Sequence, residues 1–229
     1  MLALAGMRLA VHLGPAATWL PPVRSLFPAL AGWGRPDRVA LTFDDGPSAD
    51  RTPRVLEVLA GAGIEATFFL VAERLRENLG VGRAIVAAGH EVAVHAWRHD
   101  YLIGHSYRRT LTDLARARDL VGEVAGKAPR WFRPPYGVLT GEAAFAARRL
   151  GLRPVLWTAW ARDWTASASP ENVRALLEPG LVGGATVLLH DAGRSGPPGD
   201  DATVRALPGI IAEIRARGLC PGPLRAHGL

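Results

Sequence analysis

The ten residues RVALTFDDGP, at positions 38–47, contain the pattern that decides the fold. Their first part, Arg38–Phe43, is a short apolar run that includes the β-branched residues valine and threonine, as is typical of a buried strand. The run ends at Asp44–Pro47, and aspartate, glycine and proline all favour turns. A buried strand that ends in an acidic turn is therefore the first unit of the predicted fold.

The rest of the chain repeats this unit. Runs rich in β-forming residues alternate with longer stretches of helical period, and glycines follow most of the predicted helices. Further strands are predicted at Ala66–Val71, Glu91–His95, Arg130–Arg133, Arg153–Trp157, Ala185–His190 and, weakly, Leu219–Leu224. Helices are predicted at Pro53–Ala62, Val81–Ala88, Ser106–Ala125, Gly141–Leu150, Pro170–Leu177 and Thr203–Arg217.

Strands that alternate with helices predict parallel strands joined by right-handed crossovers. The units number about seven, which predicts an α/β fold of the distorted (β/α) barrel type with about seven parallel strands. An open doubly wound sheet is the alternative. The sequence contains no internal repeat and no sign of a second domain, so residues 37–229 are expected to form a single domain.

The composition excludes several classes of protein. The net charge is +6, almost all the positive charge comes from scattered arginines, and Lys127 is the only lysine. Nucleic-acid-binding proteins more often gather such residues in one stripe, so no nucleic-acid partner is expected. Cys220 is the only cysteine, which excludes an intramolecular disulfide and any cysteine-ligated metal or iron–sulfur site.

Residues 1–36 form an N-terminal extension with three open interpretations. The stretch Leu9–Val23 contains no Lys, Arg, Asp or Glu, but a membrane-spanning helix needs about 20 apolar residues. Only Arg8 could supply the basic start of a secretion signal, and no convincing cleavage site follows. The extension is a packed segment, a poor signal or a membrane-associating segment, and the cellular location stays open.

Polar side chains stand where five of the predicted strands end. In (β/α) barrels the active site lies at the C-terminal ends of the strands, so these groups are expected to meet at one rim. They are Asp44 and Asp45 after the first strand, His95 and His99 at the third, Arg133 and Tyr136 at the fourth, Asp163 and Trp164 after the fifth, and His190 and Asp191 at the sixth.

Each of these groups has a simple structural explanation when it is taken alone. The acidic pair suits a turn, the two histidines a surface pair, the Arg133–Gly137 segment a stiff loop, and His190 a buried core histidine. Their occurrence in order, each at a strand end, favours one functional site instead. The remaining histidines lack such a context and are expected to be structural: His12, His90, His105 and His227.

The chain resembles the polysaccharide deacetylase family, the metal-dependent carbohydrate esterases that include chitin, peptidoglycan and chitooligosaccharide deacetylases. The resemblance covers roughly residue 38 to the C-terminus. It rests on TFDDGP at Thr42–Pro47, His-x-x-x-His at His95–His99, RPPYG at Arg133–Gly137, Asp-Trp at Asp163–Trp164 and Leu-Leu-His-Asp at Leu188–Asp191. Five ordered motifs are far more specific than any one of them alone.

Hydrolysis of an acetamide needs a nucleophilic water at neutral pH, and a divalent metal lowers the pKa of bound water toward about 7. Asp45, His95 and His99 offer one carboxylate and two imidazoles, the ligand types of a catalytic metal site. The resemblance implies the same three ligands for one divalent ion, usually zinc, with cobalt or another divalent ion as alternatives.

The neighbouring residues suit acid–base roles. Asp44 is expected to reach the water as the general base and to pair with Arg133. The resemblance implies that the backbone N–H of Tyr136 stabilises the oxyanion. It also implies that His190, tuned by Asp163, protonates the leaving amine, and that Trp164 and Leu189 line the pocket for the acetyl methyl group. For most of the other tryptophans, among Trp97, Trp131, Trp157 and Trp160, packing is expected rather than sugar stacking.

Two residues depart from the family pattern. Ala96 replaces the usual Ser or Thr after the first histidine, and Trp160 replaces the first carboxylate of Asp-x-x-Asp-Trp. The prediction is a metal-dependent hydrolase that removes N-acetyl groups from the amino sugars of an acetylated glycan or oligosaccharide. The alternatives are an O-acetyl esterase acting on xylan or another wall polymer, and a non-catalytic glycan-binding protein on an inactive barrel.

Overall fold

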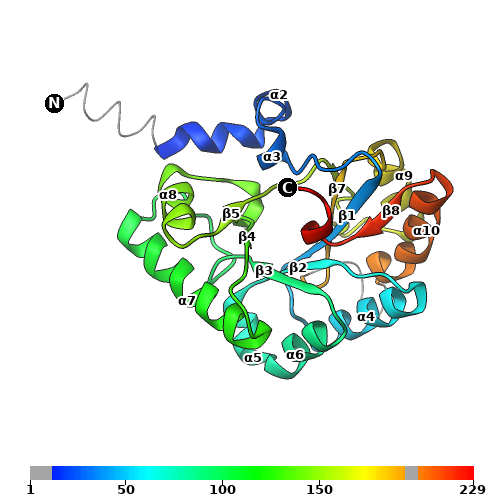
Figure 1. The fold of residues 1–229 in the computed structure, drawn as a ribbon, viewed down its shortest axis with the longest axis horizontal. Helices are drawn as coiled ribbons and strands as arrows, with labels where there is room; N and C mark the ends of the chain where they lie inside the picture. Colours follow the sequence, from blue (N-terminus) through cyan, green and yellow to red (C-terminus); the bar gives the residue numbers. More distant parts are fainter. Residues whose placement is uncertain (1–11, 194–200) are drawn as a thin grey trace.

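A computed structural model describes residues 12–193 and 201–229 of the chain. Its strands form one sheet in the order β5-β4-β3-β2-β1-β7-β6, with β8 paired to β1, and all pairs are parallel. Figure 1 shows the sheet curled around a central space. The strands are β1 (Arg38–Asp44), β2 (Thr67–Leu70), β3 (Glu91–Val94), β4 (Trp131–Phe132), β5 (Arg153–Pro154), β6 (Ala159–Trp160), β7 (Thr186–His190) and β8 (Cys220–Gly222).

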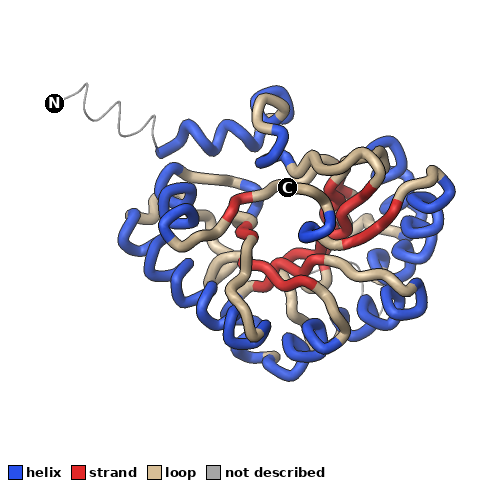
Figure 2. Tube along the Cα trace, viewed as in Figure 1, coloured by secondary structure: helices blue, strands red, loops and turns tan. Residues whose placement is uncertain are grey.

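Helices surround the sheet on its outer side, as Figure 2 shows, and the predicted distorted (β/α) barrel is thereby confirmed. The α-helices are α2 (Pro21–Arg24), α3 (Pro28–Ala31), α4 (Arg51–Ala62), α5 (Ala72–Glu77), α6 (Leu79–Ala87), α7 (Tyr107–Ala125), α8 (Gly141–Arg149), α9 (Pro170–Leu177) and α10 (Ala202–Ala216). Short 3₁₀ turns are η1 (Gly14–Trp19), η2 (Pro135–Gly137), η3 (Glu178–Gly180) and η4 (Leu224–Ala226). The sequence did not predict the short helices α2, α3 and α5, which have four, four and six residues.

Local sequence sets the ends of the longest helix, α7. The Ser106 hydroxyl accepts a hydrogen bond from the Arg109 amide at the N-terminus, and Gly126 ends the helix in the left-handed conformation at φ 66°. The buried residues recur at intervals of three and four, at Thr110, Leu114, Ala117 and Val121. This spacing places them on one face, which packs against the sheet and fixes the helix on the barrel.

The fifth predicted strand, Arg153–Trp157, is interrupted. β5 pairs with β4, whereas β6, which the sequence did not predict, pairs with β7. Between them the amide of Leu156 donates to the carbonyl of Leu30, 2.7 Å away, instead of to a neighbouring strand. Residues 153–160 thus pair with β4 at one end and with β7 at the other. Between these two pairings they hydrogen-bond to the N-terminal segment.

The side chains of β1 alternate between two apolar layers. Phe43 faces outward and stacks on Phe68 with ring centroids 5.0 Å apart, in the main core beneath the helices. Ala40 faces inward, where Phe69, Trp131 and Leu224 fill the barrel. The C-terminal residues thus close one end of the barrel, and the C-terminus lies near its centre in Figure 1. The opposite end, where the strands finish, is left for the polar side chains.

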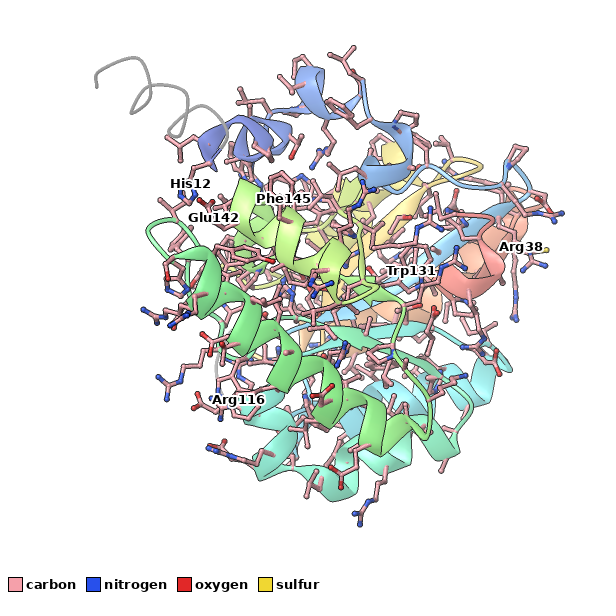
Figure 3. All side chains as sticks on the ribbon, turned by 60° about the vertical axis from the view of Figure 1, so that its left-hand side comes forward. His12, Arg38, Arg116, Trp131, Glu142 and Phe145 are labelled. Carbon is pink, nitrogen blue, oxygen red and sulfur yellow. The ribbon has the colours of Figure 1, made fainter. Side chains whose placement is uncertain are left out.

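The described part of the N-terminal segment packs along the barrel. His12 pairs with Glu142 at the start of α8, as seen in Figure 3. Further on, Thr186 donates to the carbonyl of Gly32, and the amide of Gly34 donates to the carbonyl of Gly184. No helix in residues 12–193 and 201–229 is long and apolar enough to cross a membrane. Arg8, considered above as the basic start of a signal, lies outside the described residues.

Candidate active site

The two aspartates at the end of β1 direct their side chains to the same space, although only one of them belongs to the strand. Asp44 is the last residue of β1, and the parallel register places it beside His190 at the end of β7. Asp45 follows the last residue of the strand. Its positive φ of 76° turns its side chain back toward the barrel end. Both carboxylates therefore face the side chain of His95, although adjacent residues of a regular strand would point to opposite sides.

Asp45, His95 and His99 form the group that could hold a metal ion. The Nε2 atoms of His95 and His99 lie 3.4 and 3.1 Å from Oδ1 of Asp45, and one ligand atom from each residue lies within 4.8 Å of the others. Oδ1 of Asp45 is buried and has no hydrogen-bond partner within the part of the chain that the structure describes. An unsatisfied carboxylate oxygen that faces two imidazole nitrogens fits a divalent metal ion.

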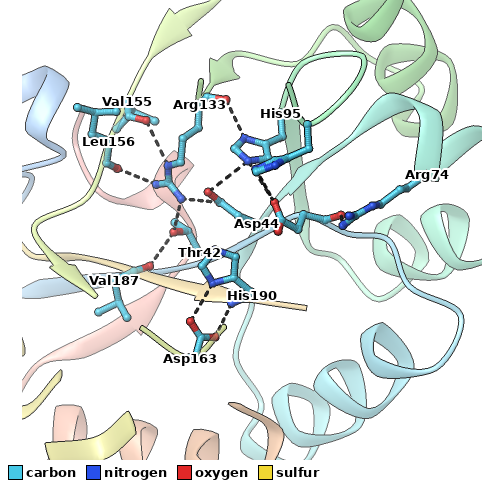
Figure 4. Close-up of polar contacts among 12 residues, drawn as sticks. Thr42, Asp44, Arg74, His95, Arg133, Val155, Leu156, Asp163, Val187 and His190 are labelled. Carbon is cyan, nitrogen blue, oxygen red and sulfur yellow. Dashed lines mark hydrogen bonds and ion pairs between the residues drawn. The ribbon is translucent and has the colours of Figure 1, made fainter. Parts of the chain in front are cut away.

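Neighbouring groups fix the orientation of these candidate ligands. Nδ1 of His95 donates to the carbonyl of Arg133 at 2.8 Å (Figure 4), and this hydrogen bond leaves Nε2 directed toward Asp45. Arg74 donates to the backbone carbonyl of Asp45 at 2.6 Å and holds the turn in place. Burial opposes ionisation of Asp45, but the two histidines outweigh it and lower the pKa of the carboxyl well below its usual range. Asp45 is therefore present as the anion that a metal requires.

The predicted contact between Arg133 and Asp44 is present and fully buried. Nη1 of Arg133 lies 2.7 Å from Oδ1 of Asp44, and it also donates to the hydroxyl of Thr42 at 2.8 Å. The remaining donors of Arg133 reach the carbonyls of Val155 and Leu156 at 3.2 and 2.7 Å (Figure 4). Arg133 thus holds one oxygen of Asp44, while the other, Oδ2, lies 3.8 Å from Nε2 of His95.

A second buried pair lies on the β7 side. Nδ1 of His190 and Oδ1 of Asp163 are 2.8 Å apart, and Oδ2 of Asp163 accepts from the His190 amide and the Thr203 hydroxyl at 2.8 and 2.7 Å. Burial favours a neutral imidazole, but the Asp163 carboxylate outweighs it and raises the pKa of His190 to about 9. Nδ1 of His190 is hydrogen-bonded to Asp163, so Nε2 is the ring nitrogen that can exchange a proton with a ligand.

A cavity of about 440 Å³ connects these groups. His99 and Tyr136 lie on one side, with ring centroids 4.4 Å apart, and Tyr136 stacks on Tyr101 at 3.9 Å. Trp164 lies edge-on to His190 at 5.0 Å. The cavity is lined by Trp19, Asp44, Asp45, His95, His99, Tyr101, Tyr136, Gly137, Trp157, Trp160, Trp164, Leu188, His190 and Gly193.

Leu189 does not line this cavity. It is fully buried in the core beneath the helices, because its side chain points away from the barrel interior. Leu188 lines the cavity in its place, on the same face of β7 as His190. The alternation of side chains along a strand gives the reason, since residues two apart share a face. That same alternation was available in the sequence and favours Leu188 over Leu189.

Asp191, which the sequence placed among the polar groups at the rim without a specific role, is fully buried and does not line the cavity. The Thr52 hydroxyl donates to it at 2.6 Å, while burial and the nearby Asp45 raise its pKa to about 7. Its carboxylate occupies the space that a Cβ at Gly46 would fill. Asp191 therefore packs directly against the turn that carries Asp45.

The rim of this (β/α) barrel thus combines a carboxylate–imidazole cluster with two buried charge pairs, a composition typical of a hydrolytic metal centre. A family model described as polysaccharide deacetylase matches residues 32–155. The chain belongs to this family, and the resemblance stated from five motifs is confirmed.

Individual relatives agree with this assignment. A chitooligosaccharide deacetylase from Bradyrhizobium sp. is 34% identical over 197 residues, which cover 81% of this chain and 88% of that protein. A peptidoglycan-N-acetylglucosamine deacetylase from Listeria monocytogenes is 32% identical over 170 residues, covering 74% of this chain. The matched region is only 36% of the Listeria protein's length.

A solved structure shows that the fold alone does not decide activity. The structure of a family 4 carbohydrate esterase pseudoenzyme from Bacillus anthracis superimposes with a TM-score of 0.76 and 26% identity. The superposition covers 83% of this chain and 65% of that chain. The functional conclusion for the present chain therefore has to rest on its own site residues.

Proposed function

We propose that this protein is a metal-dependent hydrolase that removes N-acetyl groups from amino-sugar residues of a glycan. The observation that carries the proposal is that Asp44, paired with buried Arg133, and His190, paired with buried Asp163, line one cavity with Asp45, His95 and His99. A carboxylate and an imidazole with separate charged partners, beside a metal-binding group, are the parts that amide hydrolysis needs. The names of the relatives support the substrate class.

Asp45, His95 and His99 would hold one divalent ion, for which we propose zinc. When bound, such an ion supplies a water molecule of lowered pKa and stabilises negative charge on the acetyl oxygen. The ligand set of one carboxylate and two imidazoles suits zinc and leaves room for water and substrate. Cobalt or another divalent ion would fit the same ligands.

Asp44 acts as the general base in this proposal. Arg133 occupies Oδ1, so Oδ2 is the oxygen that faces the cavity and accepts the proton of the attacking water. The water oxygen then bonds to the acetyl carbon, and the carbonyl oxygen becomes an oxyanion. The backbone N–H of Tyr136 would donate to that oxyanion, a contribution typically worth about 10²–10³-fold in rate.

His190 acts as the general acid. Its raised pKa keeps it protonated at neutral pH, and its Nε2 is free of Asp163. As the carbon–nitrogen bond breaks, Nε2 gives its proton to the departing nitrogen, and the products are acetate and a free amino sugar. Trp164 and Leu188 would enclose the acetyl methyl group, since both line the cavity beside His190.

Acetate release from three substrates tests the proposal: an N-acetylated chitooligosaccharide, a peptidoglycan fragment and an acetylated xylan. Each is incubated with chelated protein, with and without added zinc. We expect zinc-dependent acetate from an N-acetylated substrate, with one free amine for each acetate. Acetate from the xylan alone would indicate an O-acetyl esterase. Binding of these glycans without acetate, with metal present, would indicate a glycan-binding protein.

A further inference from the structure

Tryptophans form a continuous row that leads away from His190. Trp164 lies edge-on to His190, Trp160 follows at a centroid distance of 5.4 Å from Trp164, and Trp157 follows at 5.9 Å from Trp160. Trp157 is buried, at 5% exposure, whereas Trp160 is half-buried and Trp164 is 37% exposed. Trp160 and Trp164 therefore line the cavity with part of their surface accessible.

A fourth indole reaches this cavity from the N-terminal segment. Trp19 ends η1, is 48% exposed, and lines the same cavity as the catalytic groups. The segment that carries it is held to the barrel by the His12–Glu142 pair before it and the Leu30–Leu156 hydrogen bond after it. Trp19 is thus far from the other tryptophans in sequence but lines the same cavity.

Other tryptophans of the chain are packed in ways that exclude such a role. Trp131 is 1% exposed in the interior of the barrel. Trp97 packs against the main core and lies beneath the guanidinium of Arg116, 3.9 Å from the ring centroid. Packing therefore accounts for Trp97, Trp131 and Trp157, as expected from the sequence. Trp160 also packs, against Trp157 and Leu188, but it is only half-buried and lines the cavity, where Trp19 is exposed as well.

Exposed indole rings in a cleft suit the faces of a sugar ring. A pyranose carries apolar C–H groups on its faces and hydroxyls at its edge, and an indole offers a large apolar face with one N–H donor. The guanidinium of Arg162 lies 5.2 Å from the Trp160 centroid, so one cation–π contact is already made to this ring. Because Trp160 stands where the family pattern has a carboxylate, this part of the cavity offers an aromatic ring in place of a charged group.

We propose that Trp19 and Trp160 form a sugar-stacking subsite next to the residue that is deacetylated. This inference rests on the proposed function and adds to it a specificity-determining residue: Trp19 contacts a neighbouring sugar and so strengthens action on oligosaccharides relative to a single acetylated sugar. The N-terminal segment, which carries Trp19, is then part of the substrate cleft and contributes to specificity.

The test compares N-acetylglucosamine with its tetramer as substrates of the zinc-loaded protein. Trp19→Ala should lower kcat/KM for the tetramer by roughly 2- to 12-fold, through KM, and leave the monomer within about twofold. Trp19→Phe should retain most of the activity on the tetramer. The matched control is Trp33→Ala, because Trp33 is also an exposed tryptophan of the N-terminal segment, at 41%, but does not line the cavity.

A binding measurement separates this inference from the proposed reaction. Calorimetric titration with the fully deacetylated tetramer reports binding without turnover, and Trp19→Ala and Trp160→Leu should each weaken it while Trp33→Ala does not. An unchanged tetramer kcat/KM and affinity in Trp19→Ala would overturn the subsite. So would an equal loss on monomer and tetramer. If the wild type released no acetate from either substrate, the proposed function would fail, and the titration would still decide the subsite.

Discussion

Arg133→Met should be among the most destabilising single changes in this protein. The side chain of Arg133 is fully buried, pairs with Asp44 at 2.7 Å and donates to the carbonyls of Val155 and Leu156. Removing one partner of a buried ion pair typically costs about 3–5 kcal/mol, because the other charge is left uncompensated. Each buried carbonyl left without a partner adds about 1–3 kcal/mol unless water reaches it. We therefore expect a loss of at least about 4 kcal/mol, a large part of the roughly 5–15 kcal/mol that stabilises a typical domain.

The assay is urea unfolding, followed by tryptophan fluorescence, with a chelator present so that metal binding does not contribute. Arg130→Met is the matched control, because Arg130 is an exposed arginine three residues away. Its guanidinium donates to the backbone carbonyl of Leu229 and lies 4.6 Å from the Trp131 ring centroid, but within the described part of the chain it makes no buried ion pair. It should change stability by less than about 1 kcal/mol. Adding Asp44→Asn to Arg133→Met removes the uncompensated charge and should restore part of the loss. A loss below about 1 kcal/mol in Arg133→Met, or further destabilisation in the double variant, would refute this reasoning.

Two further changes test single contacts. The folded pKa of His190 is raised from 6.5 to about 9, so its pair with Asp163 adds stability that is complete below pH 6.5 and lost as the pH rises through about 9. Asp163→Asn should reduce that pH dependence in urea midpoints of the chelated protein, since Asp163 is the largest contribution that raises the pKa, and an unchanged profile would count against the pair. Gly137→Ala should cost at least about 1 kcal/mol in the same assay, since Gly137 has φ 70° and an added Cβ would meet the Trp157 ring at 2.5 Å. Gly61→Ala, in open space within α4, should be neutral or stabilising, and equal losses in both would contradict this explanation.

The sequence was most informative where local patterns carry the structure. The alternation of strand runs and helical stretches predicted the barrel, and polar residues at the strand ends predicted which side chains meet. The structure indeed brings Asp44, Asp45, His95 and His190 to one cavity. This succeeds because parallel strands joined by helices all end at the same rim, whatever the details of packing.

The sequence was less informative where the conformation of one segment is set by contacts with a segment distant in sequence. The interruption of Arg153–Trp157 follows from the hydrogen bond between Leu156 and Leu30, more than a hundred positions apart, which no local pattern encodes. Trp19 likewise lies in a stretch without clear periodicity, and only tertiary packing brings it to the cleft. Leu189 is a different case, because strand alternation was sufficient to select Leu188.

The most direct test of the central claim uses the adjacent residues Asp44 and Asp45. Zinc content and acetate release from an N-acetylated oligosaccharide are measured on the same samples of wild type, Asp44→Asn and Asp45→Asn. The account predicts that Asp45→Asn loses zinc and activity together, whereas Asp44→Asn retains zinc and is slowed by about 10²–10⁴-fold, mainly in kcat. Near-normal turnover in Asp44→Asn, or full zinc content in Asp45→Asn, would contradict it.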